Sequence, residues 1–173
     1  MFYNKLKNVR FREMIFENLK KFIYLIENQR SGNPREAARK LAVSDRTLSN
    51  YCQILKNELL APLVYDKFRE TYIFNGSGRL VWEWVEGESL TVDSLGFKNK
   101  RLNCLNEIIK RAFFRNTGNV KTLASSLGIS ERNLHYYIEL LKLEFNVPLY
   151  FDRKINSYVL QTSGCLYFRW QEN

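Results

Sequence analysis

Residues 38–48 read ARKLAVSDRTL, and residues 124–134 read ASSLGISERNL. In both stretches an Ala and a Leu at helical spacing precede a short turn. A Ser then stands where a side chain is expected to cap the start of a second helix. Each stretch therefore predicts two helices joined by a tight turn, and the second helix begins at Asp45 or Glu131.

The two stretches lie 86 residues apart, and this shift aligns most of the chain with itself. Residues 19–84 fall on residues 105–170 without a gap, and 21 of the 66 positions are identical. Self-similarity at a fixed shift indicates copies of one structural unit. We predict a first domain at residues 1–85, a connector at 86–96 and a second domain at 97–173.

Each copy predicts helix, helix, turn, helix and then short strands. Apolar residues at helical spacing mark a first helix around residues 16–26, and its counterpart around residues 102–112. Pro34 suits the first turn of a short helix that ends at Leu41, and Gly128 suits a left-handed residue after a helix end. A hairpin follows the third helix, with strands at residues 62–65 and 72–74 and at residues 148–151 and 158–160. Alternating residues beyond it predict one further strand or a short helix: Leu80, Trp82 and Trp84, and Leu166, Phe168 and Trp170. The predicted fold class is mainly α with small β-hairpins, which is an α+β class.

Composition limits the functions to consider. The chain carries 27 Lys and Arg against 18 Asp and Glu, a net charge of +9, and each copy carries +4 of it. One His, three separated Cys and the lack of P-loop, G-x-S-x-G and H-E-x-x-H motifs argue against an enzyme, a metal site or a cofactor. No apolar stretch is long enough for a membrane span. We therefore expect a cytoplasmic, nucleoid-associated protein whose partner is double-stranded DNA.

The helical pattern A-x-x-L-x-V/I-S-x-R-x-L and the following P-L-x-Y/F-D-K/R hairpin occur in both copies. Together they resemble bacterial winged helix-turn-helix transcriptional regulators, and most closely the DNA-binding domains of DeoR and WYL-type regulators. The resemblance covers nearly the whole chain, twice. It implies two tandem winged helix-turn-helix domains and a bacterial regulator of transcription.

The third helix of each copy is expected to read base edges in the major groove. The predicted base-reading residues of the first copy are Arg46, Thr47, Ser49, Asn50 and Gln53. Those of the second copy are Arg132, Asn133, His135 and Tyr136. Only the Arg is shared, so one chain is expected to read two unlike half-sites.

Basic residues on the short helices and the hairpin tips are expected to contact the DNA backbone, where they position the protein without reading sequence. They are Arg35, Arg39, Lys40, Lys67 and Arg69 in the first copy, and Lys121, Arg153 and Lys154 in the second.

Two alternatives stay open. Winged-helix domains also serve as protein–protein assembly modules, and Glu131 and Glu139 keep a homodimer or another protein partner open for the second copy. In the second alternative, the chain binds DNA as a factor of plasmid replication or of a mobile element. The first copy is more basic around its short helix, so we expect it to be the main DNA reader.

Overall fold

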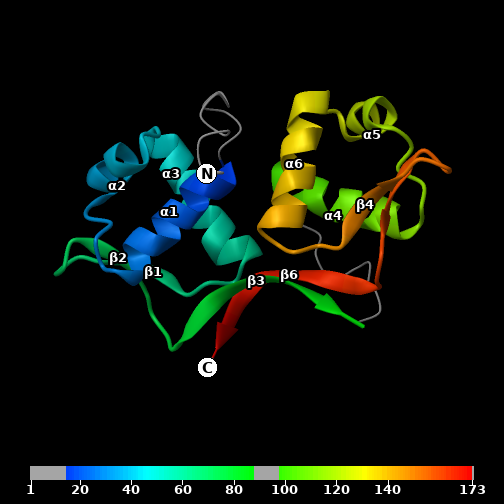
Figure 1. Cartoon of the computed structure of the whole chain (residues 1–173). Coiled ribbons are helices and arrows are strands. Elements are labelled where there is room, and N and C mark those ends of the chain that lie inside the picture. The colour runs from blue at the N-terminus through cyan, green and yellow to red at the C-terminus, as the bar shows by residue number, and fades with distance from the viewer. Residues whose placement is uncertain (1–14, 88–97, 173) are drawn as a thin grey trace, which may run out of the picture. The chain divides into compact units, whose positions relative to one another are not determined.

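The computed structural model describes residues 15–87 and 98–172 of the 173-residue chain. It has the α+β class, and its elements run in one order twice, three helices and then three strands (Figure 1). The first series is α1 Ile15–Glu27, α2 Pro34–Leu41, α3 Asp45–Gln53 with a π-helical extension η1 Ile54–Glu58, β1 Leu63–Asp66, β2 Thr71–Phe74 and β3 Gly78–Glu86. The second series is α4 Lys100–Phe113, α5 Val120–Leu127, α6 Glu131–Leu143, β4 Leu149–Asp152, β5 Ser157–Leu160 and β6 Gly164–Glu172.

The chain divides into two compact units. The first comprises Met1–Arg79 with Glu172–Asn173, and the second comprises Leu80–Gln171. The predicted connector, residues 86–96, lies outside the described residues except for Glu86 and Gly87.

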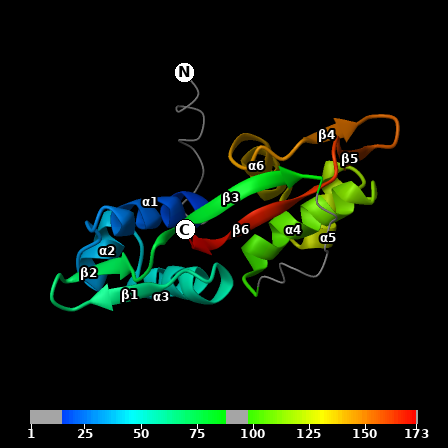
Figure 2. The same ribbon diagram turned by 90° about the horizontal axis from the view of Figure 1, so that it is seen from below.

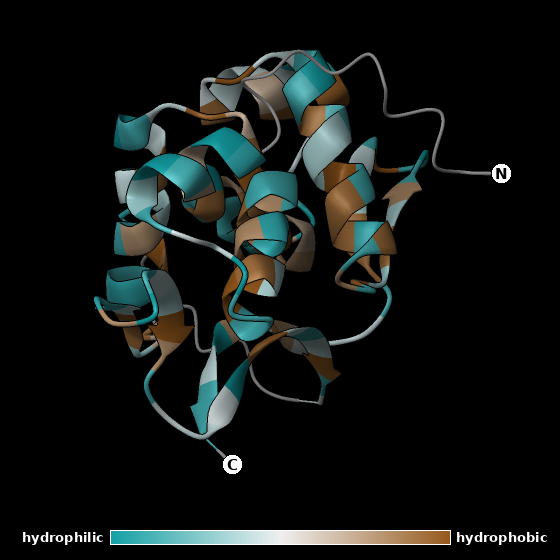
Figure 3. Ribbon diagram, turned by 90° about the vertical axis from the view of Figure 1, so that its left-hand side faces the viewer, coloured by the Kyte–Doolittle hydropathy of each residue, from teal (hydrophilic) through white to brown (hydrophobic). Residues whose placement is uncertain are grey.

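Each unit has a core formed by one face of its helices. In the first unit the side chains of this core are fully or almost fully buried: Phe16, Leu19, Phe22, Ile26, Leu48, Leu55 and Leu59. The second unit buries the matching residues: Leu102, Leu105, Ile108, Ala112, Leu134, Leu141 and Phe145. Hydrophobic and hydrophilic segments alternate along the helices in Figure 3, as expected of helices with one buried face. Burial of apolar side chains is therefore the main stabilising contribution to both units.

Capping residues set the helix boundaries that the sequence predicts. Asn33 accepts a hydrogen bond from the backbone N–H of Glu36 at 3.0 Å, and α2 begins at Pro34 and ends at Leu41 as expected. Gly128 has the left-handed conformation predicted for it, with φ of 62°. Ala42 takes the same conformation at the matching position, with φ of 53°, although a Cβ atom disfavours it.

Two hairpins follow the helices. β1 pairs antiparallel with β2, which places Asp66 opposite Thr71. β4 pairs antiparallel with β5, which places Asp152 opposite Ser157. We call these the first hairpin (residues 63–74) and the second hairpin (residues 149–160). Both hairpins lie where the sequence predicts them.

The alternating residues after each hairpin form strands, not short helices. β3 and β6 pair with each other in a separate two-stranded sheet, and they run antiparallel (Figure 2). Residues 80–86 of β3 and residues 164–171 of β6 belong to the second unit. Trp82 stacks on Phe168 with ring centroids 5.2 Å apart. Gly164 lies so close to β3 that an added Cβ would approach the Val85 carbonyl oxygen to 2.5 Å. The two predicted aromatic stripes therefore pack against each other in the second unit.

Candidate nucleic-acid interface

Helix α3 is oriented by the turn that precedes it. The Ser44 hydroxyl accepts a hydrogen bond from the backbone N–H of Thr47 at 3.2 Å and caps the helix. Leu48 and Tyr51 are buried on the inner side of α3. Because these anchors fix the rotation of the helix about its axis, they also fix which side chains face outward.

Four of the five predicted base-reading residues of the first repeat are exposed on α3: Arg46, Ser49, Asn50 and Gln53. Their spacing of three, four and seven residues places them on one side of the helix. We call this set the α3 stripe, and it contains no acidic residue. Thr47 is half-buried, and its hydroxyl lies 2.9 Å from that of Ser44, so it belongs to the cap more than to the stripe.

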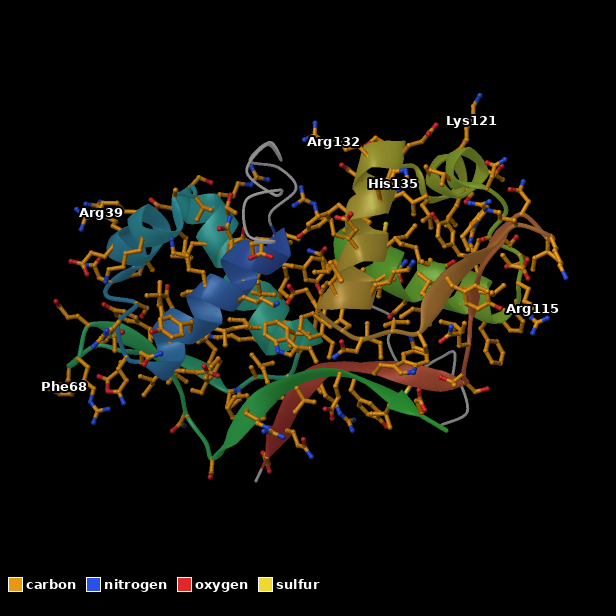
Figure 4. The ribbon with its side chains drawn as sticks, in the orientation of Figure 1. Arg39, Phe68, Arg115, Lys121, Arg132 and His135 are labelled. Atoms are coloured by element: carbon orange, nitrogen blue, oxygen red, sulfur yellow. The ribbon has the colours of Figure 1, made fainter. Side chains whose placement is uncertain are left out.

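Helix α6 presents a different outer face. Arg132, His135 and Glu139 are exposed at the spacing of one helix side, and we call them the α6 stripe. Figure 4 shows Arg132 and His135 projecting from the first half of α6. The other two predicted base readers, Asn133 and Tyr136, are half-buried. The Asn133 Oδ1 atom and the Tyr136 hydroxyl oxygen are out of contact with solvent. The second repeat thus offers fewer outward polar groups than predicted, and one of them is acidic.

The basic residues of α2 differ in what they contact. Arg35 and Arg39 are exposed, and Figure 4 shows Arg39 projecting outward from α2. The Lys40 ammonium group donates to the backbone carbonyls of Arg30 at 2.7 Å and Ser31 at 3.4 Å. Lys40 therefore holds the loop before α2, whereas the two arginines present their charge to the solvent.

The second repeat carries fewer basic residues around α5. Lys121 is exposed near the start of this helix and projects outward in Figure 4. The positions that match Arg35, Arg39 and Lys40 are Lys121, Ser125 and Ser126. The two copies carry the same net charge, but α2 of the first copy is therefore more basic than α5 of the second.

The tip of the first hairpin is held by one carboxylate. Asp66 Oδ1 accepts the backbone N–H groups of Phe68 at 2.8 Å and Arg69 at 3.1 Å. The Arg69 guanidinium lies 3.7 Å from Asp66 and donates to Gln29 Oε1 at 3.3 Å. Lys67 is exposed beside them. These bonds order the tip before any ligand arrives.

The tip of the second hairpin has the same type of turn. Asp152 Oδ1 accepts the backbone N–H of Lys154 at 2.8 Å. Arg153 and Lys154 are exposed, as predicted for backbone contacts, and Ile155 follows them with 47% of its surface exposed.

Buried hydroxyl groups connect each hairpin to the loop before the second helix of its unit. Ser31 Oγ lies 2.7 Å from Thr71 Oγ1 and accepts the backbone N–H of Tyr72 at 2.8 Å. In the second unit Thr117 Oγ1 accepts the backbone N–H of Tyr158 at 2.7 Å. Hairpin and helices are therefore held in a fixed geometry within each unit.

Two residues with exposed side chains at these surfaces were not predicted from sequence. Arg115 is exposed at the position that matches Gln29, in the loop that the second hairpin contacts. Alignment of the two copies could have identified it, because Arg69 matches Ile155 and Gln29 matches Arg115. At these two matched positions, the basic residue lies in the hairpin of the first copy and in the loop of the second. Phe68 is the second: it lies between Lys67 and Arg69 at the predicted hairpin tip, but it is not among the residues predicted to contact DNA.

The described residues contain no cluster of His, Cys, Asp and Glu arranged to hold a metal ion. No helix in this part of the chain is both long and apolar enough to cross a membrane. Burial raises the pKa of the Cys52 thiol, and it also raises that of Cys104. Reactive thiolates are favoured by a lowered pKa, so these two side chains are suited to core packing.

Comparison of the chain with protein-family models, with curated proteins and with solved structures gives no match.

Proposed function

We propose that this chain is a sequence-specific double-stranded DNA-binding protein that regulates transcription, built from two tandem winged helix-turn-helix domains. In this proposal α3 and α6 are recognition helices that enter the major groove. The two hairpins are wings that contact the sugar-phosphate backbone. The observation that carries the proposal is the α3 stripe, a run of exposed polar side chains without an acidic residue on a rigidly capped helix.

The chemistry of the α3 stripe suits base recognition. An Arg guanidinium donates two parallel hydrogen bonds to guanine, and an Asn or Gln amide donates one hydrogen bond to adenine N7 and accepts one from its amino group. Arg46, Asn50 and Gln53 supply both kinds of group on one helix side. Each such pair is worth about 1–3 kcal/mol of discrimination against a wrong base.

The basic residues around the stripe suit the DNA backbone. Arg35 and Arg39 on α2 and Lys67 on the first hairpin are exposed, as phosphate contacts require. Contacts of this kind supply affinity that falls with salt and fix the register on the duplex. Arg115 joins Lys121, Arg153 and Lys154 as a proposed backbone contact of the second repeat.

The two repeats should read unlike half-sites. The α3 and α6 stripes share only Arg46 and Arg132, because His135 and Glu139 stand where α3 has Ser49 and Gln53. One chain bound to DNA is therefore expected to select an asymmetric target. This proposal requires no cofactor and no catalytic activity, and it places the protein on the nucleoid in the cytoplasm.

A second function has one specific observation in its favour, and it concerns the second repeat alone. Glu139 on the α6 stripe is followed one turn later by Leu143, of which 73% is exposed. An acidic and apolar surface suits a protein partner or a second copy of the chain better than it suits DNA. Under this alternative the first repeat binds DNA and the second mediates assembly.

Selection of fragmented bacterial genomic DNA on the purified full chain, read by sequencing, tests the proposal. We expect a few enriched fragments upstream of genes that share an asymmetric motif, and we expect Arg46→Ala to lose the enrichment. Enrichment confined to a replication origin or an element end would instead indicate the replication or mobile-element function. No enrichment with wild-type protein would refute sequence-specific binding.

A further inference from the structure

Phe68 stands at the tip of the first hairpin with its ring entirely in solvent. Its relative exposure is 102%, whereas the other exposed large apolar side chains of the described residues range from 38% to 73%. Figure 4 shows the side chain at the end of the hairpin, pointing away from the helices of its unit. An exposed Phe ring forgoes the free energy of apolar burial, so a partner that buries the ring gains it.

The tip that carries Phe68 is ordered in advance. Its backbone N–H donates to Asp66 Oδ1 at 2.8 Å, and the neighbouring Arg69 is held by Asp66 and by Gln29. Glu70 turns the chain back with a φ of 50°. A ring on such a tip loses little backbone entropy on binding, which favours insertion into a narrow space.

The charges beside the ring indicate the chemistry of its partner. Lys67 and Arg69 flank Phe68 directly, and both are exposed; of the two acidic residues nearby, Asp66 is paired with Arg69 and Glu70 is exposed. A partner that complements the ring and these charges has a narrow apolar gap with negatively charged groups on both sides of it. A base-pair step seen from the minor groove has this character, because stacked bases lie there between two phosphate backbones.

We propose that Phe68 inserts between two adjacent base pairs from the minor groove and acts as a wedge that unstacks and unwinds the duplex. This inference rests on the proposed function and deepens it. Pyrimidine–purine steps are the most easily unstacked, so they are the expected sites of insertion. Lys154 matches Phe68 in the second hairpin, and the wedge is therefore a property of the first repeat alone.

The linking number of closed circular DNA measures such a wedge without knowledge of the target sequence. Plasmid relaxed by a topoisomerase in the presence of the full wild-type chain at low salt should show a linking-number deficit that grows with the bound fraction. Phe68→Ala should keep plasmid affinity within about threefold, since phosphate contacts supply most non-specific affinity. At equal bound fraction it should lose the deficit.

Two further variants separate the wedge from charge and from size. Phe68→Lys places the residue of the second hairpin at this position, and it should bind plasmid at least as tightly as wild type without unwinding it. Phe68→Leu should keep part of the deficit, because Leu also serves as a minor-groove wedge. Leu60→Ala removes another exposed apolar side chain of the same unit, 68% exposed, and should behave as wild type.

The outcomes distinguish failure of the wedge from failure of DNA binding. Wild-type protein that binds plasmid without a deficit, or a deficit that Phe68→Ala retains, overturns the wedge and leaves DNA binding intact. Absence of plasmid binding at low salt overturns both proposals. Sedimentation that shows wild-type self-association abolished by Phe68→Ala would assign the ring to a protein interface, and this also overturns the wedge.

Discussion

The hydroxyl groups of Ser31 and Thr71 lie 2.7 Å apart inside the first unit, 40 residues apart in the chain. They join the loop before α2 to the first residue of β2, and both side chains are buried. The second unit has the two residue types exchanged, with Thr117 in the loop and Ser157 at the start of β5. Each unit thus holds its hairpin to its helices through a buried polar contact.

Replacement of Ser31 by Ala should destabilise the first unit. The backbone N–H of Tyr72 donates to Ser31 Oγ at 2.8 Å and would lose its acceptor. A buried donor left without a partner costs about 1–3 kcal/mol, so the free energy of unfolding should fall by this amount in urea denaturation. Ser49→Ala removes an exposed hydroxyl of the same unit and should change stability by less than about 0.5 kcal/mol. Equal stability of both variants would contradict the prediction.

The residues after α2 and α5 form a matched pair for a second stability prediction. Ala42 has a φ of 53° and Gly128 a φ of 62°, both left-handed. A Cβ added at Gly128 would meet nothing closer than Lys100 Nζ at 3.6 Å, which is ordinary contact, so only backbone strain is at stake. Ala42→Gly should raise the free energy of unfolding by about 0.5–1 kcal/mol, and Gly128→Ala should lower it by about 1 kcal/mol. Thermal and urea unfolding measure both, and changes of the same sign would count against this account.

Local signals explain which elements could be predicted from sequence. Asn33, Pro34 and Ser44 act within three residues of their own positions, so they fix the starts of α2 and α3 without knowledge of the rest of the fold. The hairpins are equally local, since Pro62-Leu63 and a tight turn set them. Exposure of the α3 stripe also follows from helical periodicity alone.

Features that depend on distant partners could not be predicted. Period-two alternation indicated strands at Trp82 and Phe168, but it carries no information on which strand pairs with which. Nothing in the sequence distinguishes Lys40, which holds two backbone carbonyls, from the exposed Arg39 beside it. The partial burial of Asn133 and Tyr136 likewise depends on how α6 packs in its unit.

The stability of the first unit should decline above about pH 10. Burial, reinforced by the neighbouring Cys52, raises the pKa of Tyr72 well above its ordinary value, so Tyr72 stays neutral in the folded chain where it ionises in the unfolded chain. Its contribution is fully present below about pH 10 and is lost as the pH rises further, because the unfolded state then binds fewer protons. Tyr72→Phe should flatten the decline in urea denaturation between about pH 9 and 11. An unchanged slope in this variant would contradict the assignment.

The two basic residues at the end of α2 should separate DNA affinity from stability. Arg39→Ala should weaken binding to all duplexes alike and reduce the slope of log affinity against log salt by about one, with stability unchanged. Lys40→Ala removes the ammonium that donates to Arg30 and Ser31, so it should lower the free energy of unfolding by about 1 kcal/mol. Filter binding across salt concentrations and urea denaturation measure the two effects. Identical behaviour of the two variants would show that exposure does not distinguish their roles.

The two recognition helices should contribute unequally to target selection. Arg46 belongs to a stripe of four exposed polar residues without an acidic side chain, whereas Arg132 shares its stripe with Glu139, which repels phosphates. Arg46→Ala should weaken binding to the selected fragment by about 1–3 kcal/mol, or about 5- to 150-fold, and relax one guanine position of its motif. Arg132→Ala should relax a different position with a smaller loss, and Glu139→Gln should strengthen binding because it removes that repulsion. Quantitative binding to fragments mutated at each motif position provides the measurement. If Arg132→Ala weakens binding to the selected fragment more than Arg46→Ala does, the second repeat is the main reader of the DNA sequence. The inference drawn from the acidic residue on the α6 stripe is then wrong.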